Sequence, residues 1–301
     1  MNYEHGPSAQ RMPVWLARPI AAPGRNEAVE GTLEELRLNT VCRSARCPNR
    51  GECYASGTAT FLIMGDACTR GCGFCAVETR TPAPLDPDEP RRVAKAAARM
   101  GLSHAVITTV TRDDLADGGA AHFVAVIEAL RAALSSARVE VLTSDFAGDL
   151  DAVDAIADAK PDVFNHNVET VPRLYPTVRP GADYGRSLRV LARMKERRPE
   201  IPTKSGLMLG LGETADEVEA VMRDLRRAGV ELLTLGQYLR PSSRHLPVVE
   251  FVTPERFAEL RELGRGLGFA AVASAPFVRS SYHADELFEA VAGVPSADAA
   301  P

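Results

Sequence analysis

The chain has 301 residues, 45% of them hydrophobic, so it can bury a sizeable core as one large domain or two smaller ones. The balance of 35 Lys and Arg against 40 Asp and Glu gives a formal net charge of −5, which argues against a general nucleic-acid binder. No apolar run approaches the roughly 20 residues of a membrane span, so no membrane partner is expected.

The first segment, residues 1 to about 30, is polar and rich in Pro and Gly, and we expect an arm that wraps the protein or is partly disordered. Its short apolar stretch is broken by Arg18 and two prolines, unlike a secretion signal. With six thiols that must stay reduced, this favours a cytoplasmic protein. A short helix is predicted around 32–38.

From Thr60 onward, short apolar or β-branched runs alternate with stretches of helical period. The predicted strands are 60–65, 104–110, 139–145, 163–168, 203–209 and 232–238. The predicted helices lie near 89–100, 119–135, 149–159, 184–197, 214–228 and 254–267. This alternation favours an α/β fold with a parallel sheet and outer helices, arranged as a closed or partly closed barrel of six strand–helix units. A further apolar run, 269–277, leads into a polar tail with a disordered-looking end.

Two helix starts are marked by capping residues. Thr214 and Glu217 form a predicted capping box, and Thr253 with Pro254 marks the start of the last helix.

Polar residues fall at the predicted carboxyl ends of the strands, where parallel sheets bind their ligands. They are Thr108–Thr111, Ser144, Asp145, Asn165, His166, Asn167, Glu169 and Gln237. Lys204 and Ser205 instead open the fifth predicted strand. His166 alternates to the other side of its strand and is interpreted as a core histidine.

All six cysteines lie between residues 42 and 75, in two triplets of different spacing. Cys42, Cys47 and Cys53 form C-x₄-C-x₅-C, and Cys68, Cys72 and Cys75 form C-x₃-C-x₂-C. Disulfide frameworks belong to small secreted domains, and zinc sites usually need a nearby fourth ligand that neither triplet has. Three thiolates can hold three irons of a cubane cluster and leave the fourth iron open, so two iron–sulfur clusters are favoured over these alternatives.

The C-x₃-C-x₂-C triplet after a first strand resembles the signature of radical S-adenosylmethionine (SAM) enzymes. The resemblance implies that Cys68, Cys72 and Cys75 ligate a [4Fe–4S] cluster whose open iron chelates SAM, which is then cleaved to a 5′-deoxyadenosyl radical. Phe74 is a candidate for packing near the adenine, with ordinary loop packing as the alternative.

Further cofactor candidates follow from this resemblance. Asn165, Asn167 and Glu169 suit the ribose hydroxyls or amino group of SAM, with loop capping as the alternative. Lys204 is included among the cofactor-binding candidates, although it opens its strand.

The upstream triplet narrows the resemblance to the lipoyl synthase family. It is carried by TVCRSARCPNRGEC, CTRGCGFC, NHNVET, KSGLMLGLGET, QYLRPS and VRSSYHAD, from about residue 13 to about residue 289. The resemblance implies that Cys42, Cys47 and Cys53 bind a second, auxiliary [4Fe–4S] cluster with Ser281 as its fourth ligand. A hard alkoxide suits iron less well than thiolate, so that corner should be labile.

The family's reaction would be the insertion of two sulfurs, taken from the auxiliary cluster, at C6 and C8 of a protein-bound octanoyl-lysine. The implied partners are octanoylated carrier domains (E2 subunits of 2-oxoacid dehydrogenases and the glycine cleavage H protein), a reduced electron donor and an iron–sulfur carrier that rebuilds the cluster. The implied fold is a partial (β/α)₆ radical SAM barrel over 60–268. Extensions at 1–59 and 269–301 would hold the auxiliary cluster.

Other readings stay open from the residues alone. A methylthiotransferase would need a further domain, a biotin synthase would place its second-cluster ligands inside the barrel, and an electron carrier would favour a smaller fold. Arg179 and Arg240 could hold a carboxylate or an acid of the carrier, with surface solvation as an equal alternative. The basic stretch at 193–200 could dock an acidic carrier domain, but a solvated helix face is favoured.

Overall fold

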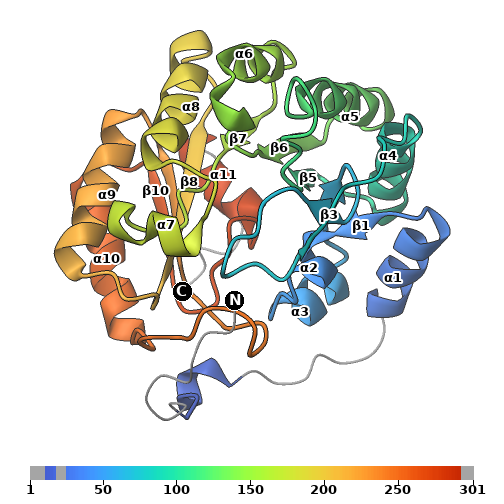
Figure 1. Cartoon of the computed structure of the whole chain (residues 1–301). Helices are drawn as coiled ribbons and strands as arrows, with labels where there is room; N and C mark the ends of the chain where they lie inside the picture. The colour runs from blue at the N-terminus through green and yellow to red at the C-terminus, as the bar shows by residue number, and fades with distance from the viewer. Residues whose placement is uncertain (1–10, 18–24, 293–301) are drawn as a thin grey trace.

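A computed structural model describes residues 11–17 and 25–292 of the chain. Its centre is an eight-stranded sheet in the order β1-β2-β5-β6-β7-β8-β9-β10. The strands are β1 (Asn39–Thr40), β2 (Thr60–Ile63), β5 (His104–Thr109), β6 (Arg138–Leu142), β7 (Val163–Asn165), β8 (Thr203–Leu209), β9 (Leu232–Gln237) and β10 (Ala271–Ser274). β1 runs antiparallel to β2, and all the other pairings are parallel. The sheet curls into an incomplete barrel with helices around its outside (Figure 1).

The outer helices are α4 (Glu89–Met100), α5 (Ala120–Ala133), α6 (Leu150–Asp158), α8 (Tyr184–Arg197), α9 (Ala215–Arg227) and α10 (Pro254–Gly266). All six predicted strands and all six predicted helices are confirmed, with ends that differ by at most three residues. The capping box at the start of α9 is present, because Glu217 N–H donates to Thr214 Oγ1 at 3.3 Å and the Glu217 carboxylate accepts from Thr214 N–H. Thr253 caps α10, which begins at Pro254.

Each barrel strand divides its side chains between two faces, because successive residues point in opposite directions. On β5, Ile107 packs in the main core between sheet and helices, whereas Val106 lines the barrel's interior cavity. On β6, Val141 likewise packs in the main core, and Leu142 lines the cavity. The outward face therefore stabilises the fold, and the inward face is free to carry a site.

The region before the barrel differs from its prediction. Helix α1 (Arg25–Glu35) starts and ends earlier than the expected helix at 32–38 and takes in the end of the expected arm. Val29 and Leu33 lie on its buried side. The buried Leu36 and then Arg37, with a left-handed φ of 49°, follow its end. Short helices α2 (Val41–Ser44) and α3 (Arg50–Ala55) come next. Residues 1–10 and 18–24 of the predicted arm lie outside the described residues.

The region after α10 also contains more structure than predicted. The apolar run 269–277 supplies β10, which pairs in parallel with β9 and extends the sheet beyond six parallel strands. Sheet pairing therefore crosses both predicted domain boundaries, through β1 and through β10. Helix α11 (Ala284–Ala292) follows, and Leu287 packs against Val163, Leu232 and Ala271. Those three residues start their strands, so α11 covers the amino end of the barrel. The predicted disordered end, 293–301, lies outside the described residues.

Smaller elements complete the described chain. They are the 3₁₀ turns η1 (Val14–Leu16), η2 (Phe146–Gly148) and η3 (Pro172–Leu174), helix α7 (Tyr175–Val178), and the parallel pair β3 (Ala67–Cys68) and β4 (Glu78–Thr79). Within the described ranges, none of the helices combines the length and apolarity needed to cross a membrane.

Candidate active site

One continuous cavity of about 890 Å³ occupies the inner side of the sheet, and all six cysteines line it. None of the six forms a disulfide. The downstream triplet follows β2, and the upstream triplet comes from α2, α3 and the turn between them. The fold therefore brings the two sequence motifs to a single space.

The downstream loop is held at its start by Arg70, which lies between Cys68 and Cys72. Its guanidinium donates to both carboxylate oxygens of Asp113, at 2.6 and 2.7 Å, and lies 2.7 Å from Asp145 Oδ1. Asp145 is buried, which raises the pKa of its carboxyl, but Arg70 outweighs burial and the pKa is lowered. This network ties the loop to the residues that follow β5 and β6.

The other end of the same loop packs on the segment after β9. Leu246 N–H donates to Gly73 O at 3.0 Å, and His245 Nε2 lies 3.0 Å from Cys75 O. A Cβ on Gly73 would lie 2.8 Å from Leu246 Cδ1, so this approach needs glycine. Phe74 lines the cavity and also packs against a small cluster that includes Tyr238 and Leu246. Both sequence interpretations of Phe74 thus remain compatible with its position.

The upstream triplet is positioned by short helices. Thr40 caps α2 by accepting from Arg43 N–H at 3.3 Å, and its hydroxyl lies 2.8 Å from Tyr54 Oη. Burial raises the pKa of Cys42 to about 11, and desolvation raises the pKa of Cys75 to about 12. These cysteines are therefore neutral thiols in the free protein, and a bound metal would displace the proton.

The donor set fits iron–sulfur clusters better than a single ion. Among the described residues, no three His, Cys, Asp or Glu side chains converge as the ligands of one metal ion would. Cysteines that each bind a different iron of a cubane need not converge on one point. Two separate thiol triplets around one large cavity match that arrangement.

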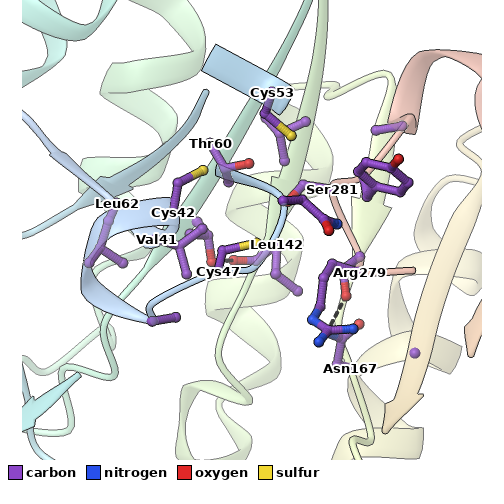
Figure 2. Close-up of a pocket in the computed structure, with 18 of the residues that line it drawn as sticks. Val41, Cys42, Cys47, Cys53, Thr60, Leu62, Leu142, Asn167, Arg279 and Ser281 are labelled. Carbon is purple, nitrogen blue, oxygen red and sulfur yellow. Dashed lines mark hydrogen bonds between the residues drawn. The ribbon is translucent and has the colours of Figure 1, made fainter. Parts of the chain in front are cut away.

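The C-terminal segment brings Ser281 to this cavity. Ser281 lines the same cavity as Cys42, Cys47 and Cys53, and Figure 2 labels all four among the lining residues. The segment is tied to the upstream helices, because Asn49 Nδ2 donates to Phe277 O at 2.8 Å and Tyr282 Oη donates to Glu52 Oε1 at 2.7 Å. The predicted auxiliary ligand and the upstream cysteines, more than 220 residues apart, are thus brought together.

Polar groups after β7 line the same cavity. Asn167 Nδ2 donates to Glu169 Oε1 at 3.0 Å and to Ser280 Oγ at 2.5 Å, while its buried Oδ1 has no partner among the described residues. Arg179 donates through Nη1 to Asn167 O at 2.9 Å, and its buried Nε likewise has no partner within the described chain. Unpaired buried polar atoms cost free energy unless a ligand satisfies them.

Glu169 has an unusual backbone. Its φ is 65°, a left-handed value that a non-glycine residue rarely adopts. Two backbone hydrogen bonds to β8 hold it there, from Glu169 N–H to Gly206 O and from Met208 N–H to Glu169 O, both at 2.9 Å. Desolvation raises the pKa of the Glu169 carboxyl, although Arg179 and Asn167 act in the opposite direction. Such strain is typical of residues that serve a site.

The two remaining cofactor candidates, Asn165 and Lys204, do not line the cavity. They are register partners on β7 and β8, and both bind the buried carboxylate of Glu140, at 3.3 and 2.8 Å. His104 Nε2 lies 3.4 Å from the same carboxylate. Burial raises the pKa of Glu140, but Lys204 and His104 outweigh it and the pKa is lowered. Asn165 and Lys204 therefore lie away from the cavity: Lys204 is near the start of β8, and its register partner Asn165 ends the short strand β7.

Two further polar residues of the predicted strands, His166 and Gln237, have structural roles. His166 is a core histidine as expected, with Nδ1 3.0 Å from Thr143 O and Nε2 3.0 Å from Ser187 Oγ. Gln237 serves structure, since its amide donates to Leu209 O at 3.1 Å and to Glu250 O at 3.0 Å. The sequence interpretation missed the Arg70 network, for which the predicted strand-end position of Asp145 was the one available signal.

The basic stretch at 193–200 is neutralised by carboxylates on neighbouring elements. Arg193 pairs with Asp154 at 2.6 Å, and Lys195 pairs with Glu231 at 2.6 Å. Arg197 and Arg198 both pair with Asp158. The favoured interpretation of this stretch as a solvated helix face is thereby supported, and its basic charges are paired within the protein.

Comparison with known proteins places these observations in a family. The family model of the radical SAM superfamily matches residues 62–225. Lipoyl synthases from Caldanaerobacter subterraneus and Rubrobacter xylanophilus are 58% and 57% identical to the chain, over 91% and 92% of its length and 96% and 86% of theirs.

Solved structures show the same fold at low identity. Methylornithine synthase has a TM-score of 0.55 at 13% identity, over 86% of this chain and 84% of that one. HydG, a maturase of the [FeFe]-hydrogenase, has a TM-score of 0.56 at 15% identity, over 81% of this chain and 64% of that one.

Proposed function

The chain belongs to the lipoyl synthase family of the radical SAM superfamily, and from this premise we propose which of its residues carry the reaction. The enzyme is a sulfurtransferase that inserts two sulfur atoms at C6 and C8 of a protein-bound octanoyl-lysine, using SAM and two [4Fe–4S] clusters. An alkyl C–H bond has no acidity for a general base to exploit, so a radical route is needed. What remains to be assigned is the role of each residue.

Cys68, Cys72 and Cys75 would hold the cluster that works with SAM. When bound, that cluster and SAM supply the radical that removes hydrogen from the acyl chain. The protein's own contribution is to fix the cysteine loop, through Arg70 at one end and Gly73 at the other, and to shield the reacting carbon from water.

Asn167, Glu169 and Arg179 would bind SAM. The unpaired Asn167 Oδ1 is an acceptor that suits an ammonium or a ribose hydroxyl, and the unpaired Arg179 Nε is a donor that suits a carboxylate. Glu169 adds a negative charge beside them, and Phe74 is in place to pack against a flat ring. Asn165 and Lys204 are left out of this set because they bind Glu140.

Cys42, Cys47, Cys53 and Ser281 would hold the auxiliary cluster, which supplies the sulfurs. A serine oxygen is a harder ligand than a thiolate, so Ser281 would mark the corner that opens first. The support for this set is that Ser281 lies on a segment bonded to α3 and lines the same cavity as the three cysteines.

The enzyme acts on octanoylated carrier proteins. We propose in addition that it needs a reduced electron donor, and an iron–sulfur carrier that restores the auxiliary cluster after each turnover. Six reduced thiols, some of them only partly buried, favour a cytoplasmic location.

The observation that carries the assignment is that both cysteine triplets and Ser281 line one cavity. Its test is anaerobic reconstitution of the wild type and two variants, Cys72→Ala and Cys47→Ala, with SAM, reductant and an octanoyl-lysine peptide. We expect Cys72→Ala to lose SAM cleavage. We expect Cys47→Ala to keep SAM cleavage and lose sulfur insertion, because the two triplets would serve separate clusters.

Iron content and mass spectrometry of the peptide provide the readout. Each variant should retain roughly half of the wild-type iron if each triplet holds one four-iron cluster. Loss of SAM cleavage in a Cys47→Ala protein that retains roughly half of the wild-type iron would overturn the division of labour between the triplets.

A further inference from the structure

Exposed arginines gather at one opening of the cavity. Arg46 and Arg240 line the cavity and are solvent-exposed, and Arg244 is exposed on the same loop as Arg240. Arg46 Nη1 donates to Pro241 O at 3.3 Å, which joins the two sides of the opening. We call Arg46, Arg240 and Arg244 the arginine rim.

The arginine rim lies between the two cysteine triplets. Arg46 directly precedes Cys47, and the loop of Arg240 and Arg244 is bonded to the downstream cysteine loop through His245 and Leu246. This loop also follows β9, at the carboxyl end of the strands. An acyl chain that enters across the rim would reach the cavity that both cysteine triplets line.

The three rim arginines, like the exposed Arg189 on α8, form no ion pair among the described residues. Other arginines on the surface, such as Arg193, Arg197 and Arg198, pair with carboxylates. The Arg240 guanidinium instead donates to backbone carbonyls of its own loop, at 2.6 and 2.8 Å. In a chain with an excess of acidic residues, three such cations at one opening call for an outside partner.

Another part of the cavity lining has the opposite charge. Asp285 and Glu286 line it there and are exposed, near Gly101 and His104, which lie at the amino end of β5. An acidic partner would be repelled there and attracted to the arginine rim. The cavity is therefore polarised between its basic rim and this acidic wall.

We infer that the arginine rim docks the folded carrier domain through carboxylates that surround its octanoyl-lysine. This inference rests on the proposed function, since it names the surface by which that substrate reaches the site. Charged surfaces of this kind steer association and fix orientation more than they add affinity. The rim would thus distinguish a whole acidic carrier domain from a short acyl peptide.

The test compares two substrates: an octanoylated carrier domain with an acidic surface, and an octanoyl-lysine peptide without acidic residues. Charge reversal of the rim residue with the fewest bonds, Arg244→Glu, should lower kcat/KM for the domain about tenfold relative to kcat/KM for the peptide at low salt. Arg189→Glu, an exposed arginine on α8, is the matched control and should leave this ratio unchanged. In the wild type, kcat/KM for the domain relative to kcat/KM for the peptide should also fall as the salt concentration rises, because salt screens exposed charges.

A second variant, Arg46→Gln, protects the test against a local folding defect in the loop, and the cluster absorbance of each variant checks loading. If kcat/KM for the domain relative to kcat/KM for the peptide is equal in the wild type, Arg244→Glu and Arg46→Gln, the inference is overturned. If the wild type converts neither substrate although SAM is cleaved, the proposed function fails instead, so the two failures are distinguishable.

Discussion

The side-chain amide of Asn167 donates a 2.5 Å hydrogen bond to the hydroxyl of Ser280, and so joins the residue after β7 to the residue before Ser281. Asn167 belongs to the proposed SAM site and Ser281 to the proposed auxiliary site. Both Asn167 and Ser281 lie at the same cavity (Figure 2). A side-chain hydrogen bond therefore connects the proposed SAM site to the segment that carries the proposed auxiliary ligand.

Removal of this hydrogen bond should uncouple SAM cleavage from sulfur insertion. In Ser280→Ala we expect SAM cleavage to continue while the sulfur inserted per SAM cleaved falls several-fold, because the segment that carries Ser281 loses a restraint of about 1 kcal/mol. The ratio of 5′-deoxyadenosine to inserted sulfur measures this. Ser280→Thr, which keeps the hydroxyl, is the control, and an unchanged ratio in Ser280→Ala would contradict the coupling.

Gly236 on β9 gives the C-terminal segment its path across the sheet. A Cβ at this position would lie 2.1 Å from Val278 O, a distance that the backbone must relieve by moving. We expect Gly236→Ala to lower the free energy of unfolding by about 1–3 kcal/mol, as overpacking does, and to reduce iron in the auxiliary site. Urea unfolding and iron content are the measurements.

The matched control for that change is Gly266→Ala at the end of α10, where an added Cβ meets nothing within 4 Å. It should be neutral or slightly stabilising, because alanine is the better helix former. Equal destabilisation by the two substitutions would show that the close approach at Gly236 is not responsible.

Tyr282 and Glu52 fasten the two extensions together, through the 2.7 Å bond from Tyr282 Oη to Glu52 Oε1. Glu52 precedes Cys53, and Tyr282 follows Ser281, so the bond holds one proposed ligand beside the other. We expect Tyr282→Phe to speed the loss of the auxiliary cluster on exposure to a chelator, followed by absorbance. Glu52→Gln retains an acceptor for this bond and should behave like the wild type. Loss of the cluster from Tyr282→Phe at the wild-type rate would contradict this role of the bond.

The buried His166 predicts a dependence of stability on pH. Burial lowers the pKa of its imidazole from 6.5 to about 4. The unfolded chain then binds the proton first, so stability is full above pH 6.5 and is lost as pH falls toward 4, by on the order of 3 kcal/mol. In His166→Asn, the free energy of unfolding measured by urea titration should depend less on pH over this range. A slope identical to that of the wild type would contradict this assignment.

The barrel and the two cysteine triplets could be predicted from short stretches of sequence. The triplet spacings are local, and the apolar periodicity of each strand and helix is imposed by the face that it buries. Thr214 and Thr253 mark helix starts for the same reason, because capping involves residues only three apart. The family resemblance further supplied Ser281, which its composition alone would have left as an ordinary surface serine.

Which polar residues meet at the cavity could not be predicted in this way, because it depends on contacts between distant segments. Asn165 and Asn167 have the same chemistry, yet Asn165 ends β7 and binds Glu140, whereas Asn167 lies two residues beyond the strand and lines the cavity. β10 and the bond from Tyr282 to Glu52 depend likewise on contacts between distant segments. The most basic stretch of the sequence is neutralised by ion pairs, whereas the scattered Arg46, Arg240 and Arg244 come together at the opening. Charge that is dispersed along the chain becomes a surface only when folding sets the distances between its residues.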